Sequence, residues 1–257
     1  MVLAQIDDIF AQSLLGEYDD DAPWEAVRTL HGIGSREVFE HAAEWCKSPN
    51  PLKRARGADV LAQLGKTADH PNNNFPDGSF SVVSALVRGE KDPLPLDSAI
   101  HALGHIGNPL AVPLVIAHQL HPKAEVRFAV AFALGKFADV PLAIEALLAL
   151  TQDADEDVRD WATFGVGVLG NCDSPEIRDA LVNRLRDSDE DVREEAMVGL
   201  GKRKDQRVLS ALLSVLEQPT TADRAVEAAS EMLDMQNDGE GWKGGDYAAA
   251  LRKRFSL

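Results

Sequence analysis

Positive charge is scarce in this sequence, where 26 lysines and arginines stand against 42 aspartates and glutamates, for a formal net charge of −16. Such a chain repels phosphate backbones and anionic lipid surfaces, so we expect neither nucleic-acid nor membrane partners. No apolar run reaches the roughly 18 residues of a membrane span. Residues 1–15 contain Asp7 and Asp8 and no basic start, which is unlike a signal peptide.

Cysteine and recognisable catalytic motifs are also nearly absent. Cys46 and Cys172 lie far apart without metal-ligand spacing, so we expect reduced thiols in a cytoplasmic protein. The sequence contains no GxSxG elbow, no phosphate-binding glycine loop of known spacing and no His-Glu dipeptide in that order. It therefore predicts no cofactor and favours a non-enzymatic protein.

The sequence does contain one repeated helical pattern. In DEDVRDWATFGVGVLG (155–170), with Val158 as position 0, small or apolar residues fall at positions 0, 4, 8, 9, 11 and 12, on one face of a helix. Asp155 is a suitable N-cap, and Gly170 with Asn171 a suitable stop. Aligned on positions 0, 4, 8 and 12, the helix begins at Ala22, Lys53, Pro95, Val126, Val158, Val192 and Arg224.

These starts lie 31, 42, 31, 32, 34 and 32 residues apart, which leaves room for an amphipathic first helix before each repeated second helix. We therefore predict an all-α chain in which residues 1–257 form a single repeat solenoid of about seven helix pairs. An irregular loop at 66–79, rich in Pro, Asn and Gly, explains the long spacing, and a cap at 246–256, with a helix over Tyr247–Phe255, closes the array. The expected pairs are Leu3–Leu15 with Trp24–Ile33, Arg36–Lys47 with Pro51–Leu64, Phe80–Gly89 with Leu96–Ile106, Pro109–Leu120 with Ala124–Phe137, Pro141–Leu150 with Glu156–Leu169, Pro175–Arg186 with Glu190–Gly201, and Arg207–Leu216 with Ala222–Met235.

The runs EVRFAVAFALGKFAD, DVRDWATFGVGVLG and DVREEAMVGLG resemble the HEAT-like repeat of the phycobilisome-lyase type over nearly the whole chain. Residues 157–213, with VRDWA and RKDQRVLSALL, also resemble bacterial HEAT-repeat proteins of the YibA type. The resemblance implies a right-handed α-α superhelix. Because members of the YibA-type group can be encoded beside Rhs-type toxins, it also implies an immunity or antitoxin role. The phycobilisome-lyase resemblance implies the alternative, a bilin-lyase-like or metal-dependent enzyme subunit.

Two residue types recur within the repeated helix for reasons that we interpret as structural. Arginine at position 1 (Arg127, Arg159 and Arg193) can bridge a carboxylate or free carbonyls of a neighbouring repeat, and a substrate-binding row is the alternative. Glycine at position 9 (Gly135, Gly167 and Gly201) indicates close approach of helices rather than a phosphate cradle. Replacing Arg159 should then affect stability more than binding.

Positions 2, 3, 6 and 10 point away from the buried face and should line a concave surface. Two adjacent repeats place large aromatic residues there, with more apolar area than a monomer usually exposes. We predict that they anchor a partner protein with a basic surface, selected by nearby acids. Burial of the aromatics between helices as ordinary core stays open. The predicted partner-binding residues are Phe128, Phe132, Asp160, Trp161, Phe164, Glu194 and Glu195.

One pair of histidines has a spacing that a metal could use. His101 and His105 are four residues apart on one helix face, and Asp97 lies one turn earlier. Because no glutamate is placed as a general base, solvated or partner-facing histidines are the main interpretation. A metal site formed by Asp97, His101 and His105 is the minority interpretation. The sequence thus predicts a protein–protein interaction module that binds through its concave face.

Overall fold

The computed structural model describes residues 2–220, 222–235 and 241–257 of the chain. In these ranges it contains fifteen α-helices, three short 3₁₀ or π segments and no strand. The predicted all-α fold class is confirmed. The helices fall into two compact units, Met1–Phe137 and Ala138–Leu257.

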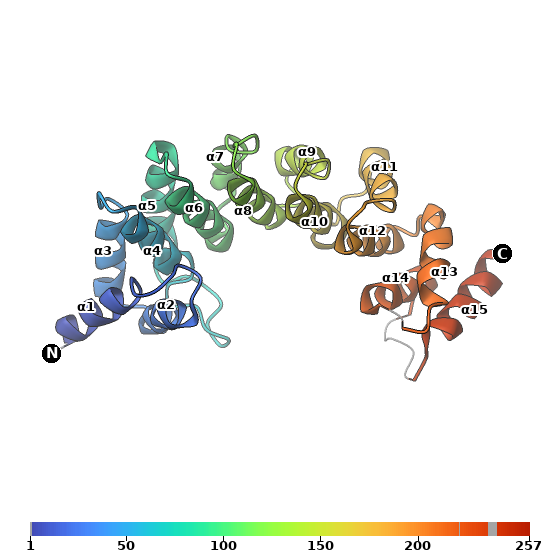
Figure 1. Cartoon of the computed structure of the whole chain (residues 1–257), viewed down its shortest axis with the longest axis horizontal. Helices are drawn as coiled ribbons and strands as arrows, with labels where there is room; N and C mark the ends of the chain where they lie inside the picture. Colours follow the sequence, from blue (N-terminus) through green and yellow to red (C-terminus); the bar gives the residue numbers. More distant parts are fainter. Residues whose placement is uncertain (1, 221, 236–240) are drawn as a thin grey trace. The chain divides into compact units, whose positions relative to one another are not determined.

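The first unit, Met1–Phe137, consists of four helix pairs. The second helices α2, α4, α6 and α8 pack each against the next, and each also packs against the first helix of its own pair. Figure 1 shows this alternation of first and second helices. The bounds are α1 (Val2–Gln12), α2 (Asp21–Ile33), α3 (Arg36–Trp45), α4 (Pro51–Ala62), α5 (Pro76–Gly89), α6 (Pro93–Ile106), the 3₁₀ turn η1 (Pro109–Ala111), α7 (Val112–Ile116) and α8 (Ala124–Gly135).

The second unit repeats the same arrangement, with α10, α12 and α14 packed in series. Its last helix packs against α13 and α14, as expected of a terminal cap. This helix begins at Gly244, before the predicted Tyr247. The glycine-rich segment 238–245 predicts a link before this helix, and its residues 238–240 lie outside the described residues. The bounds are α9 (Pro141–Leu150), α10 (Glu156–Phe164), the π turn η2 (Gly165–Leu169), α11 (Pro175–Arg184), α12 (Glu190–Lys202), the 3₁₀ turn η3 (Gln206–Val208), α13 (Leu209–Leu216), α14 (Asp223–Leu233) and α15 (Gly244–Phe255).

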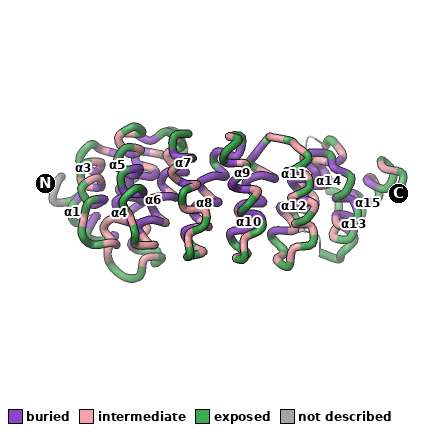
Figure 2. The backbone as a smooth tube through the Cα atoms, turned by 90° about the horizontal axis from the view of Figure 1, so that it is seen from above, coloured by how far each residue is buried: buried purple, intermediate pink, exposed green. Residues whose placement is uncertain are grey.

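Local sequence signals explain where the helices begin. The Asp155 side chain caps α10 by accepting a hydrogen bond of 3.3 Å from the Val158 amide, as predicted. Ser174 and Asp189 cap α11 and α12 in the same way. In the repeat that begins at Val158, the apolar residues at positions 0, 4 and 8 are buried, but Leu169 at position 11 is 36% exposed, contrary to its predicted place on the buried face. Figure 2 shows buried residues where helices face one another within each unit.

Several predicted boundaries differ from the structure. Helix α5 begins at Pro76, so the predicted loop over 66–79 is shorter, because proline and Asp77 form a favourable first turn. The predicted helix Pro109–Leu120 is a 3₁₀ turn followed by the short α7. The predicted helix Glu156–Leu169 changes to a π turn at Gly165. In each case the local sequence permits a turn that apolar periodicity alone does not reveal.

The predicted bridge from a position 1 arginine to a neighbouring repeat is confirmed for Arg159. Arg159 donates from Nε and Nη2 to both carboxylate oxygens of Asp187 in the next repeat, at 3.0 and 2.8 Å, and from Nη1 to the carbonyls before its own helix. Arg54 makes the same pattern with Glu90, at 2.6 and 3.0 Å. Arg127 and Arg193 also donate to the carbonyls that precede their helices. These bidentate and carbonyl bonds tie each repeat to its loop.

Two of the position 9 glycines also have the predicted packing role. A Cβ atom on Gly201 would lie 2.7 Å from the Ala228 carbonyl oxygen of α14, too close for any side chain. Gly167 faces Gly199 of α12, whose own Cβ would lie 2.7 Å from the Gly167 Cα. The close approach of the π turn and α12 therefore requires glycine at position 199, whereas a Cβ atom on Gly167 would lie 3.2 Å from Leu181 Cδ2, a tight contact.

Candidate functional site

Five of the predicted binding residues gather in the second unit with one arginine. We call this set the acid-aromatic face: Asp160, Trp161 and Phe164 of α10, Glu194 and Glu195 of α12, and Arg224 of α14. The Trp161 and Phe164 rings meet edge to face with centroids 5.6 Å apart. The Arg224 guanidinium lies over the Phe164 ring, 5.6 Å from its centroid. Both aromatics are half-buried, so each presents part of its ring to solvent.

Arg224 balances only part of the negative charge on this face. It donates to Glu195 Oε1 at 2.7 Å and to Glu227 Oε2 at 2.8 Å. Two further carboxylate oxygens, Asp160 Oδ1 and Glu195 Oε2, are buried and accept no hydrogen bond from any residue described in the structure. Glu195 as a whole is only 8% exposed. Buried acceptors normally have donors, so these two oxygens are suited to receive one from a ligand.

The carboxyl groups of the face have raised pKa values. Burial raises the pKa of Glu195 to about 7, against the partial compensation of Arg224. Burial, together with repulsion from Asp191, Asp189 and Asp157, raises the pKa of Asp160 to about 6. The ionised carboxylates therefore lower the free energy of unfolding, and a bound cation would remove this cost.

Replacing Asp160 with asparagine is expected to raise the free energy of unfolding by about 1 kcal/mol at neutral pH, because the half-buried charge is screened in part by solvent. The folded pKa lies above the unfolded value, so the cost of the charge is fully present above about pH 6. It declines as the pH falls through about 6 and vanishes only well below about 4, where both states are protonated.

Urea denaturation of the wild type and Asp160→Asn across this pH range measures the effect. Glu145→Gln, which changes an exposed carboxyl of α9, is the matched control and should have little effect. A loss of stability in Asp160→Asn at neutral pH would show that the carboxylate has a structural role instead.

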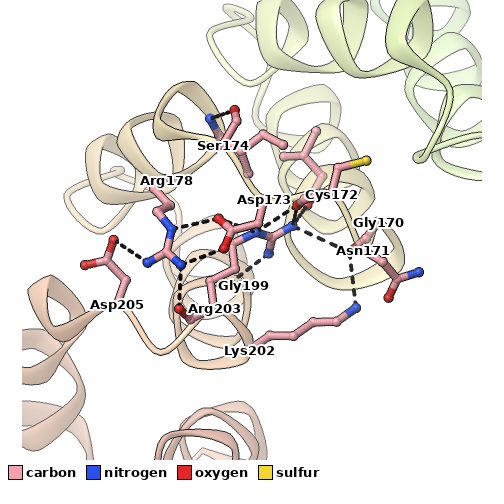
Figure 3. Close-up of polar contacts among 12 residues, drawn as sticks. Gly170, Asn171, Cys172, Asp173, Ser174, Arg178, Gly199, Lys202, Arg203 and Asp205 are labelled. Carbon is pink, nitrogen blue, oxygen red and sulfur yellow. Dashed lines mark hydrogen bonds and ion pairs between the residues drawn. The ribbon is translucent and has the colours of Figure 1, made fainter.

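A buried arginine fastens the end of α10 to α12 and so fixes the helices that carry the face. The Arg203 guanidinium lies between the π turn and α12, as Figure 3 shows. It donates to the carbonyls of Gly167 and Val166, each at 2.7 Å, of Gly199 at 2.9 Å and of Cys172 at 2.7 Å. The π turn frees carbonyl groups that an α-helix would use internally, and one planar guanidinium satisfies several of them.

The other predicted binding residues lie in the first unit. Phe128 and Phe132 are half-buried on α8, and the Phe132 ring contacts His101 and His105 with centroids 4.8 and 5.0 Å apart. His101 Nδ1 faces Asp97, 3.6 Å from its Oδ2. Burial, with the neighbouring His101, lowers the pKa of His105 to about 4. Within the described part of the chain, no three His, Cys, Asp or Glu side chains form a group that could hold a metal ion.

Side chains at position 3 of the repeated helix do not point outward as we expected. Arg56, Ser98, Ala129 and Glu195, all at this position, are buried. Each second helix packs against the next second helix of its unit, which covers that side and narrows the outward stripe. The sequence did not lead us to predict Arg224 as a site residue. A charged residue at position 0, where Val126, Val158 and Val192 are apolar, was a signal that could have indicated it.

The comparison with known families agrees with this helical repeat geometry. The model of HEAT repeats matches residues 81–167 and 164–233, a span that covers more than half of the 257 residues. The chain is a HEAT-repeat protein. It is 30% identical over 227 residues to protein YibA of Escherichia coli strain K12, a match that covers 86% of this chain and 79% of YibA. This HEAT-repeat protein is therefore of the YibA type.

Solved structures share the fold. The crystal structure of YibA from Escherichia coli aligns with a TM-score of 0.71 and 27% identity, covering 96% of this HEAT-repeat protein and 95% of that chain. A designed armadillo repeat protein aligns with a TM-score of 0.56 and 16% identity, over 77% of this chain and 100% of that one. The second likeness shows the solenoid fold alone. Repeat solenoids of this kind commonly serve as scaffolds for protein binding. No helix of the described chain is long and apolar enough to cross a membrane.

Proposed function

We propose that this HEAT-repeat protein is a non-enzymatic interaction module that binds a basic protein through the acid-aromatic face. The observation that carries the proposal is the pair of buried carboxylate oxygens, Asp160 Oδ1 and Glu195 Oε2, that accept no hydrogen bond from the described residues. A lysine or arginine of a partner would donate hydrogen bonds to these oxygens and balance their negative charge. Charge-assisted hydrogen bonds of this kind are stronger than those between neutral groups.

The surroundings of the two oxygens support the same partner chemistry. Asp157, Asp189 and Asp191 add negative charge around Asp160, which speeds encounter with a basic surface. Trp161 and Phe164 are rigid, half-buried anchors beside the acids, and aromatic residues in such positions often dominate binding energy. Phe128 and Phe132 of the first unit are proposed as further anchors for the partner.

The most specific form of the proposal is an immunity protein that neutralises a toxin with a basic surface. It rests on the resemblance to YibA-type proteins, and the acid-aromatic face would then block the toxin. The free thiols Cys46 and Cys172 suit the reducing cytoplasm, where such a protein would act.

Affinity capture with two variants tests the proposal. We expect the wild type to enrich one or a few basic proteins from extract of the source cells. Trp161→Ala combined with Phe164→Ala should deplete them several-fold while helicity is retained, because the anchors are lost. Leu142→Ala, which truncates a side chain of α9 that is 54% exposed, is the matched control and should capture as well as the wild type. Equal capture by the double variant, or capture of acidic proteins only, would contradict the proposal.

A further inference from the structure

The first unit contains a cavity that the proposed function does not use. Its volume is about 280 Å³, and it lies between α2, α4 and α6 beside the turn after α1. This volume is at the small end of the roughly 300–1,000 Å³ typical of ligand pockets, so it suits a small molecule or one long side chain. The polar and aromatic groups that matter for recognition are Tyr18, Trp24, Asp59, Asp97, Ser98 and His101.

The floor of the cavity is a fixed polar network. The Tyr18 hydroxyl donates to Asp59 Oδ2 at 2.8 Å and lies 2.7 Å from Ser98 Oγ, which joins the turn after α1 to α4 and α6. The buried Arg56, which does not line the cavity, fixes this network, because it donates to the Tyr18 carbonyl and, at 3.3 Å, to Asp59 Oδ2. A site whose polar groups are already held in place binds a ligand with little ordering cost.

The charge of the lining selects a cation. Three carboxyl residues, Asp19, Asp59 and Asp97, line the cavity, and no lysine or arginine of the described chain is among its lining residues. Burial lowers the pKa values of His31 and His105, so both rings stay neutral near neutral pH. Arg56 pairs with Asp59, which leaves Asp97 and Asp19 to supply negative charge to the lining.

The aromatic wall favours a planar cation. The Arg56 guanidinium already lies over the Tyr18 and Trp24 rings, at 4.0 and 4.9 Å from their centroids. Guanidinium groups stack on aromatic faces and pair with carboxylates more readily than ammonium groups do. Trp24 also lines the cavity, so its ring is placed to stack on a planar cation bound there.

We propose that this cavity binds an alkylguanidinium group, held by Asp97 and the Trp24 ring of its lining. The group belongs either to a free small molecule or to an arginine side chain of a protein. The site lies wholly within the first unit, so its failure leaves the proposed function of the acid-aromatic face untouched.

Isothermal titration calorimetry with N-butylguanidinium and N-butylurea tests the site, because the two probes share a shape and differ in charge. The wild type should bind N-butylguanidinium with one-to-one stoichiometry and N-butylurea at least about tenfold more weakly. Asp97→Asn should weaken N-butylguanidinium about tenfold, and Asp97→Lys should abolish its binding. Glu40→Gln, which removes an exposed charge of α3, should bind like the wild type.

A third probe, N-acetyl-arginine N-methylamide, distinguishes the two sources. Tighter binding than N-butylguanidinium assigns the site to a protein side chain, and weaker binding assigns it to a free molecule. Circular dichroism verifies that each variant is folded. Equal affinity for the urea, no binding of either cation, or an unchanged affinity in Asp97→Asn would overturn the proposal.

Discussion

Replacing Arg203 with methionine is expected to lower the free energy of unfolding by about 4 kcal/mol, the largest effect of any single substitution considered for the second unit. Arg203 is 7% exposed, and its guanidinium donates to four carbonyls at 2.7–2.9 Å. Methionine fills much of the same volume but donates nothing. The carbonyls of Val166 and Gly167 would then be buried without donors, which costs more than the lost bonds themselves.

Two companion variants show whether the carbonyl bonds are responsible. Arg203→Lys keeps the charge, but its single ammonium group cannot donate to all of these carbonyls at once. It should therefore lower the free energy of unfolding nearly as much as Arg203→Met does. Lys202→Met removes a half-buried amine that donates to the Val168 carbonyl at 2.8 Å, and it should cost only about 1 kcal/mol. Urea denaturation followed by circular dichroism measures all three. If Arg203→Met costs no more than Lys202→Met, the assigned role of Arg203 is wrong.

Replacing Arg56 with methionine is expected to cost about 3–5 kcal/mol in the first unit, because a buried charge loses its partner. Arg56 is 1% exposed and donates to Asp59, to the Tyr18 carbonyl and to the Ser13 carbonyl at 2.9 Å. Burial already raises the pKa of Asp59 to about 6, and Arg56 holds it below the value that burial alone would give. Without Arg56, Asp59 should be protonated at neutral pH.

A double-mutant cycle separates charge pairing from packing at this site. Asp59→Asn alone should cost less than Arg56→Met, because asparagine can still accept from Tyr18. In the Asp59→Asn background, Arg56→Met should lose part of its effect, which measures the coupling of the pair. Additive effects of the two substitutions would show that Arg56 acts through its carbonyl and ring contacts alone.

The sequence was sufficient to predict the repeat and the structural role of Arg159 at position 1, because both depend on local spacing. Val158, Ala162 and Val166 fall on one face at helical period, and Arg159 follows Val158 as Arg193 follows Val192. The packing of repeats then brings each of these arginines next to the loop whose carbonyl or carboxylate groups accept its hydrogen bonds. Periodicity also placed Trp161 and Phe164 on a face that remains half open to solvent.

Contacts between distant residues were not predictable in this way. Arg203 acts on carbonyls up to 37 residues away, and only because α10 ends in a π turn that apolar periodicity does not signal. Tyr18 lies in a turn, yet it bonds residues 41 and 80 positions later, which defines the floor of the cavity. Burial of Glu195 depends on α14 packing beside α12, which a single helical wheel does not include.

We propose that Asp160 and its neighbours serve the binding of a basic partner rather than stability. The most direct measurement is the dissociation constant of the captured basic protein for the wild type and for Asp160→Asn, at low and at physiological salt. We predict that Asp160→Asn, although more stable, binds about tenfold more weakly and with a smaller salt dependence. Equal or tighter binding by Asp160→Asn at both salt concentrations would contradict the claim.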